Sequence, residues 1–131
     1  MHYLIDTNII IYRLKDMGNV NANFLKNNKS QMSLSVISYG ELVFGAKKIK
    51  SGRKNLKTVN AIKKIFPLID VTSKIMNVFG EIKAYTQKTG KPVDDMDLLI
   101  ASTAIANDFT LVTHNRKHFE NIPNLKLEDW F

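Results

Sequence analysis

The sequence predicts an α/β fold in which a mainly parallel sheet of about four to five strands is flanked by helices. Short apolar runs of strand length alternate with longer segments of helical periodicity along all 131 residues. Parallel strands need long crossover connections, and the helical segments between the predicted strands supply them. Because no repeat, linker or low-complexity segment interrupts this alternation, we expect one domain over residues 1–131.

The first half of the chain is predicted to contain two strands and three helices. A short apolar run at 2–5 ends at Asp6, and the apolar residues after it have helical spacing to about residue 14. Gly18 marks the end of this segment, and a second short helix is expected at 22–27. Residues 32–35 alternate in the manner of a strand, and a helix is expected at 37–48, before Gly52.

The second half begins with a basic amphipathic helix at 53–66, which Pro67 stops. Its predicted inward positions are Leu56, Val59, Ile62, Ile65 and Phe66. A strand at 68–71 precedes a helix at 73–88, whose predicted inward positions are Ile75, Val78, Phe79, Ile82 and Tyr85. Gly90 and Pro92 indicate a turn, after which we expect a helix at 97–107 and strands at 109–113 and 125–127.

Composition narrows the class of function. The chain has 19 Lys and Arg against 12 Asp and Glu, a net charge of +7, which favours a polyanionic partner such as nucleic acid. It has no cysteine, which excludes disulfides and cysteine-ligated metals. No apolar run is long enough to span a membrane, and an acid at position 6 interrupts any signal-peptide core. We therefore expect a cytoplasmic protein without a membrane segment.

Acidic residues are concentrated where an α/β fold places its active groups. Asp6 follows the first predicted strand, and Glu41 and Asp97 lie early in the helices of other crossovers, so the three can converge beyond the carboxyl ends of the strands. Asp94 and Asp95 lie close to Asp97. Like charges this close repel unless a hard divalent cation such as Mg²⁺ or Mn²⁺ binds them. An acidic site on a basic protein indicates phosphodiester chemistry.

Each acid also has a structural interpretation. Asp6 suits the N-cap of the helix that follows it, and Ser38 and Glu41 fit the capping-box pattern S-x-x-E. The three aspartates can cap a helix and complement its dipole, although one acid suffices for a cap. His114 and His118 have the spacing of a zinc pair, but Asn115 replaces the glutamate of H-E-x-x-H, which argues against that motif.

Four blocks in this order resemble the PIN-domain toxins of the VapC family. They are LIDTNIIIY at 4–12, SLSVISYGELVFGAKK at 33–48, DDMDLLIASTAIAND at 94–108 and LVTHNRKHFENIPNLKLEDW at 111–130. The resemblance implies a PIN-like three-layer sandwich and a Mg²⁺- or Mn²⁺-dependent endoribonuclease, the toxin of a type II toxin–antitoxin system. It also implies a homodimer, cleavage of a structured RNA such as a tRNA to arrest translation, and neutralisation by a VapB-type antitoxin.

By block, the resemblance assigns Asp6, Glu41 and Asp97 as catalytic residues and metal ligands. Thr7, Asn8 and Asn115 are expected to support the ligands, as metal sites generally require, and Asp95 is expected at the rim. The family often carries a fourth acid in the last block. Asn115 stands in that region here, which favours a one-metal centre.

RNA binding is predicted on the basic stretch that follows the second block. Its residues are Lys47, Lys48, Lys50, Arg53, Lys54 and Lys57. Two other functions remain open from the sequence. One is a PIN-type nuclease that processes RNA without an antitoxin. The other is a non-catalytic nucleic-acid-binding module in which the acids only cap helices.

Overall fold

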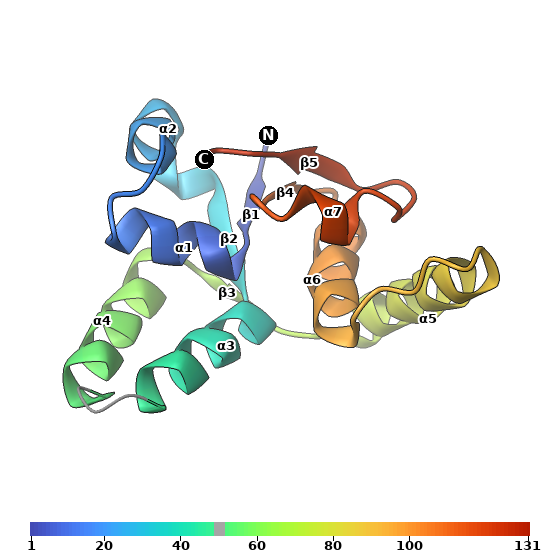
Figure 1. The fold of residues 1–131 in the computed structure, drawn as a ribbon, viewed down its shortest axis with the longest axis horizontal. Helices are drawn as coiled ribbons and strands as arrows, with labels where there is room; N and C mark the ends of the chain where they lie inside the picture. The colour runs from blue at the N-terminus through green and yellow to red at the C-terminus, as the bar shows by residue number, and fades with distance from the viewer. Residues whose placement is uncertain (49–51) are drawn as a thin grey trace.

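A five-stranded parallel sheet forms the centre of the molecule (Figure 1). The computed structural model describes residues 1–48 and 52–131, and for residues 52–54 the backbone alone. The strands are β1 (Tyr3–Ile5), β2 (Met32–Ser35), β3 (Leu68–Ile69), β4 (Thr110–Val112) and β5 (Lys126–Glu128). They lie in the order β3-β2-β1-β4-β5, and all four neighbouring pairs are parallel. The predicted sheet is confirmed.

Helices cover both faces of this sheet and make a three-layer sandwich, as Figure 1 shows. On one side lie α1 (Thr7–Leu14), α2 (Val20–Lys26), α3 (Val36–Lys47) and α4 (Gly52–Ile65). On the other lie α5 (Ser73–Lys88), α6 (Asp95–Ala106) and the short α7 (Arg116–Phe119). A 3-10 turn, η1 (Lys29–Gln31), leads into β2. Neither η1 nor α7 was predicted from the sequence, because each makes only about one helical turn and so leaves no repeating hydrophobic pattern.

Two hydrophobic clusters, one on each side of the sheet, hold the layers together. Tyr3 and Ile5 face the cluster formed with α1 to α4, and Leu4 between them faces the cluster formed with α5 to α7. This alternation follows from the two-residue period of a strand. Phe24 and Phe119 are almost fully buried in opposite clusters. The sandwich therefore fixes β1, which carries Asp6 at its end, from both sides.

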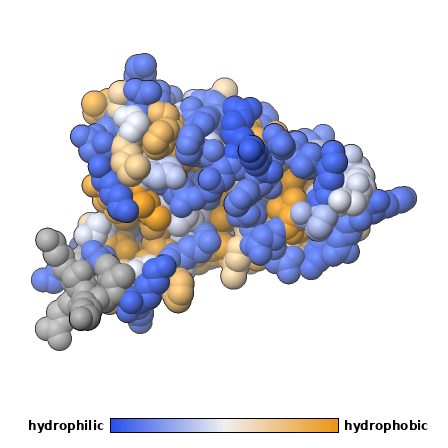
Figure 2. Space-filling view, in the orientation of Figure 1, coloured by the Kyte–Doolittle hydropathy of each residue, from blue (hydrophilic) through white to orange (hydrophobic). Residues whose placement is uncertain are grey.

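Two predicted core positions are wrong. Ile65 is 55% exposed at the end of α4, and Tyr85 is 49% exposed on α5. Both satisfy the helical period, but each lies at the margin of its apolar stripe, where the neighbouring layer no longer covers it. Hydrophilic side chains cover most of the face shown in Figure 2, with smaller hydrophobic patches between them. Within the described residues, no helix combines the length and apolar character needed to span a membrane.

The end of the chain braces the loop that follows β4. The Phe131 ring stacks on His114 with centroids 4.1 Å apart, and His114 Nδ1 lies 3.0 Å from Asp129 Oδ2. The Phe131 carbonyl accepts a hydrogen bond from Asn19 N at 2.7 Å. At Gly18, where φ is +58°, an added Cβ would lie only 2.7 Å from that carbonyl oxygen, so glycine is required. These contacts hold His114, and hence the loop beside it, against α1 and α2.

Candidate active site

The candidate site lies beyond the carboxyl ends of β1 and β4. The chain places β2 and β3 on one side of β1, and β4 and β5 on the other. Strand order therefore reverses between β1 and β4, and open α/β sheets bind their ligands at such a reversal. Asp6 directly follows β1, and Thr113 directly follows β4. Asp6 N also donates to Val112 O at 2.9 Å, which holds the two strand ends together.

Asp6 is a buried carboxylate with both oxygens engaged. Its Oδ1 accepts from Thr7 N at 2.8 Å and its Oδ2 accepts from Thr113 Oγ1 at 2.7 Å. Burial raises the pKa of Asp6 from its ordinary value of 3.8 to about 6. The two hydrogen bonds oppose that rise, and the charges of Asp97 and Glu41 add to it. A carboxylate offers about four lone-pair positions, so each oxygen keeps one for a cation. The N-cap interpretation of Asp6 is confirmed, and it is compatible with a metal role.

Glu41 reaches the same site from the middle of α3. Its Oε1 accepts a hydrogen bond from Thr7 Oγ1 at 2.6 Å, so Thr7 bridges the two acids: its backbone N–H binds Asp6 and its hydroxyl binds Glu41. The capping-box interpretation of Glu41 is wrong. The N-cap of α3 is Ser35, whose side chain accepts from Ile37 N, and Ser38 is buried inside the helix. Glu41 therefore has no role at the helix start.

Asp97 lies in the first turn of α6, and its side chain is 23% exposed. Its Oδ2 lies 3.2 Å from Nδ1 of His118, a residue of α7. Burial raises the pKa of Asp97, the nearby His118 lowers it, and the charges of Asp94 and Glu41 raise it. In the sequence, His118 was considered only as one of two histidines with the spacing of a zinc pair. In the structure, it forms an ion pair with a predicted catalytic acid.

The other two aspartates of the cluster have separate environments. Asp94 is the N-cap of α6: its Oδ2 accepts from Met96 N at 3.1 Å. Asp95, which was expected at the rim, instead pairs with Lys83, Nζ to Oδ1 at 3.0 Å, and its side chain is 60% exposed. Successive side chains at the start of a helix point about 100° apart. Asp94 therefore faces the site, whereas Asp95, one residue later, does not.

These residues line one cavity of about 300 Å³, which we call the acid cavity. Its lining is Asp6, Thr7, Asn8, Glu41, Asp94, Asp97, Asn115 and His118. All three predicted catalytic acids and three of the four predicted supporting residues are thus brought together, and Asp95 is not among them. Thr113 was not singled out from the sequence. Its position at a strand end was the available signal, but only the fold shows that it donates to Asp6.

The donor set suits a hard divalent cation. Four carboxylates and two side-chain amides line the acid cavity, and Mg²⁺ and Mn²⁺ prefer such oxygen ligands. A cation would also offset the burial and like-charge repulsion that raise the pKa of Asp6. Among the described residues, no three Asp, Glu or His side chains already surround one point at metal-binding distance.

The predicted RNA-binding residues that the structure describes do not line the acid cavity. Lys47 and Lys48 are exposed at the end of α3, and Lys57 is exposed on α4. Lys50 lies outside the described residues, as do the side chains of Arg53 and Lys54. Lys48 nevertheless shares a neighbouring cavity with Glu41. Lys91 and Lys117, which were not predicted, line another cavity together with Asp94 and Asp97.

Comparison with known proteins agrees with this geometry. The family model described as PIN domain matches residues 3–125. The chain is 36% identical over 133 residues to Ribonuclease VapC2 of Rickettsia felis, covering 99% of this chain and 98% of that protein. It is 30% identical over 130 residues to the tRNA(fMet)-specific endonuclease VapC of Salmonella typhimurium, with the same coverage.

Solved structures give the same result. The crystal structure of VapBC2 from Rickettsia felis bound to a promoter DNA fragment superimposes with a TM-score of 0.91 at 34% identity, and all of both chains is covered. The DNA-bound VapBC structure from Salmonella typhimurium gives a TM-score of 0.93 at 30% identity, covering 100% of this chain and 99% of that one. The fold, the sequence match and the acid cavity lead to one assignment: the chain belongs to the PIN-domain family and, within it, to the VapC ribonucleases.

Proposed function

We propose that residues 1–131 form a single domain that acts as a divalent-metal-dependent endoribonuclease, the toxin of a type II toxin–antitoxin pair. The observation that carries this proposal is the acid cavity, where Asp6, Glu41 and Asp97 meet at the reversal of strand order. Relatives named as ribonucleases, one of them specific for tRNA(fMet), support RNA as the substrate class and a tRNA as the substrate. The proposed place of action is the cytoplasm, where tRNA is used.

In this proposal Asp6 and Asp97 bind Mg²⁺ or Mn²⁺, and Glu41 binds it or orients the attacking water. When bound, the cation supplies Lewis acidity at the phosphodiester and lowers the pKa of a water. Thr7 and Thr113 fix the Asp6 carboxylate from both sides, and Thr7 also holds Glu41. Asn8 and Asn115 add amide groups to the lining. The side chain of Glu41 or Asp97 must turn inward for three ligands to meet.

The proposed partners are a VapB-type antitoxin and a second copy of the chain. Solved structures of relatives are VapBC complexes, which supports an antitoxin. Phe44 is 66% exposed on α3 and Met96 is 50% exposed on α6, and together they line an apolar depression that adjoins Glu41. We expect this face to form the homodimer contact, and Phe44→Glu to convert a dimer into a monomer in gel filtration.

The proposed activity is tested with purified protein and total tRNA. Cleavage at defined sites is expected with Mg²⁺ or Mn²⁺, and none with EDTA. Cleavage that persists in EDTA would contradict the metal mechanism. A folded protein that binds tRNA but never cleaves it would support the non-catalytic module instead. Co-purification with a small charged protein from the neighbouring reading frame would support the toxin assignment, and its absence would favour an RNA-processing nuclease.

A further inference from the structure

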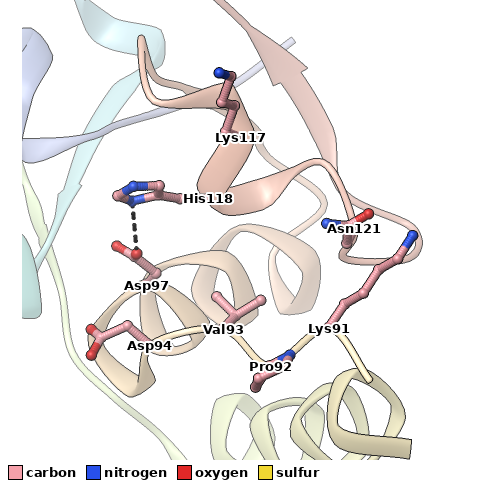
Figure 3. A pocket seen from close by; sticks show the side chains of 8 residues that line it. All are labelled: Lys91, Pro92, Val93, Asp94, Asp97, Lys117, His118 and Asn121. Atoms are coloured by element: carbon pink, nitrogen blue, oxygen red, sulfur yellow. Dashed lines mark ion pairs between the residues drawn. The ribbon is translucent and has the colours of Figure 1, made fainter. Parts of the chain in front are cut away.

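A second cavity adjoins the acid cavity and is lined by lysines. It has a volume of about 340 Å³, and we call it the lysine cavity after Lys91 and Lys117. It shares Asp94, Asp97 and His118 with the acid cavity, so the pair formed by Asp97 and His118 stands where the two cavities meet. Figure 3 shows this pair, with Lys91 extending beside Asn121 on the side opposite Asp94.

The two lysines are carried by well-anchored backbone. Lys91 follows α5, and its N–H donates to Thr86 O at 2.9 Å. Lys117 belongs to α7, which is fastened by Phe119, a residue only 1% exposed in the core beneath α6. The backbone positions are thus set before any ligand binds, and only the flexible lysine stems must be ordered.

The charges of these lysines are not used within the described part of the protein. The ion pairs found there involve Lys83, Lys126 and two histidines, and neither Lys91 nor Lys117 is among them. Both residues are exposed and line the same cavity as Asp94 and Asp97. In Figure 3, Lys91 lies on the side opposite these acids, and the flexible Lys117 side chain points away from Lys91. At the boundary between the two cavities, acidic side chains therefore lie next to two lysines without an ion-pair partner among the described residues.

An RNA strand that crosses this boundary has neighbouring phosphates in two different environments. One phosphate can lie in the acid cavity only with a cation, because carboxylates line it. The next phosphate along the strand can be bound directly by ammonium groups, to which Lys supplies compact positive charge. Asn121 adds an amide that can donate to a phosphate or to a ribose hydroxyl.

We propose that the lysine cavity binds the RNA backbone phosphate next to the scissile one, and so sets the register of the strand over the acids. This inference rests on the proposed ribonuclease function and names a subsite of it. An acidic protein segment would offer carboxylates to the same lysines. RNA is favoured because the lysine cavity shares Asp97 with the acid cavity, so an anion bound there lies next to the proposed catalytic site.

The test combines a charge-removing variant with a charge-removing substrate. Lys91→Gln/Lys117→Gln is compared with Lys26→Gln/Lys29→Gln, an equal loss of charge at exposed positions on α2 and η1. Each protein is given the same cleavable RNA, either unmodified or with one neutral methylphosphonate linkage immediately 5′ or 3′ of the cut. For the unaltered protein, one of these substitutions is expected to lower kcat/KM about tenfold, the effect of one charged hydrogen bond.

The Lys91→Gln/Lys117→Gln protein is expected to show a similar loss with unmodified RNA and no further loss with the neutral linkage. Such non-additivity shows that protein and phosphate interact directly. Equal kinetics for this variant and the Lys26→Gln/Lys29→Gln control would overturn the subsite, even if the variant bound an acidic partner less tightly.

RNA-binding measurements distinguish the proposed lysine subsite from the proposed nuclease activity. The slope of log affinity against log salt is measured for single-stranded RNA. This slope is negative, and its magnitude should decrease by about 0.7 for each phosphate that the variant no longer neutralises. A lower slope in a protein that cleaves nothing would support the subsite and contradict the nuclease. An unchanged slope in a protein that does cleave would support the nuclease and contradict the subsite.

Discussion

Thr113 Oγ1 donates a 2.7 Å hydrogen bond to Oδ2 of Asp6, across 107 residues of sequence. This bond joins the end of β4 to the end of β1 at the point where the strand order reverses. The Thr113 hydroxyl also accepts from Asn115 N at 3.0 Å, so one side chain positions both a predicted ligand and the loop that carries Asn115.

Thr113→Val removes the hydroxyl and keeps the shape of the side chain. The Asp6 carboxylate then loses one of its two donors, so its pKa should rise further and the protein should lose about 1.5–3 kcal/mol of stability. Cleavage should fall because Asp6 is no longer held in one orientation. Thr113→Ser, which keeps the hydroxyl, is the control. Denaturant unfolding and RNA cleavage measure the two effects, and a Val variant as active as the Ser variant would contradict this role.

The raised pKa of Asp6 predicts how stability depends on pH without metal. Between pH 3.8 and about 6, the folded protein holds a proton that the unfolded chain has released, so stability falls as the pH rises through this range. The full loss, reached above pH 6, is about 3 kcal/mol. Asp6→Asn should remove this component. If unfolding free energies of the variant and the parent, measured from pH 4 to 7 in EDTA, fall in parallel, Asp6 is not the group responsible.

Added cation should reverse that trend. A metal that binds only the folded, deprotonated site stabilises by an amount that grows with its concentration over Kd. We therefore expect Mn²⁺ to raise the Tm more at pH 7 than at pH 5. The measurement is a thermal melt at each pH with and without Mn²⁺, and an equal gain at both values would argue against Asp6 as a ligand.

Asn115→Asp adds a fifth carboxylate to the lining of the acid cavity. Cation affinity should increase, because the new oxygen brings the charge that the present amide lacks. Asn121→Asp is the matched control, since Asn121 lines the lysine cavity and not the acid cavity. Calorimetric titration with Mn²⁺ is expected to distinguish the two variants. Equal affinities would place Asn115 outside the ligand set.

The exposed lysines of α3 and α4 are expected to contribute a separate, long-range attraction for RNA. Replacing Lys47, Lys48 and Lys57 by Gln should flatten the salt dependence of tRNA binding and leave the melting temperature unchanged. Because these residues do not line the acid cavity, the variant should show a higher KM with little change in kcat. A salt slope equal to that of the parent would mean that this surface does not face the RNA.

Elements with a clear period were predicted closely from sequence. The strand Met32–Ser35 and the helix Ser73–Lys88 have the predicted bounds, and other elements begin or end within one to three residues of theirs. Apolar spacing decides these elements, and apolar spacing is visible in a single sequence. Convergence of Asp6 and Asp97 was also predicted, because topology alone brings strand ends and helix starts to one edge. Glu41 was expected early in its helix, but it lies in the middle of α3 and still reaches the acid cavity.

Details that depend on side-chain direction were not predictable in this way. Ser35, rather than Ser38, caps α3 because the chain turns directly after β2, and no propensity distinguishes two serines three residues apart. Asp94 rather than Asp95 lines the acid cavity for a similar reason. His118 joins Asp97 through α7, a four-residue helix too short to leave a periodic signal.

Asp97 is proposed to bind the catalytic cation, and comparing Asp97→Asn with Asp95→Asn tests this role most directly. Both changes remove one negative charge from the first turn of α6, which by itself costs about 0.3–1 kcal/mol. Only Asp97 lines the acid cavity, whereas Asp95 pairs with Lys83.

RNA cleavage and thermal melting are measured on the same preparations of both variants. We predict that Asp97→Asn melts near the parent and loses more than about 100-fold in cleavage, beyond the range for residues that only support a ligand. Asp95→Asn should keep nearly full activity. A well-folded Asp97→Asn protein that cleaves RNA as well as Asp95→Asn would contradict the metal role and leave Asp97 as a helix-stabilising charge.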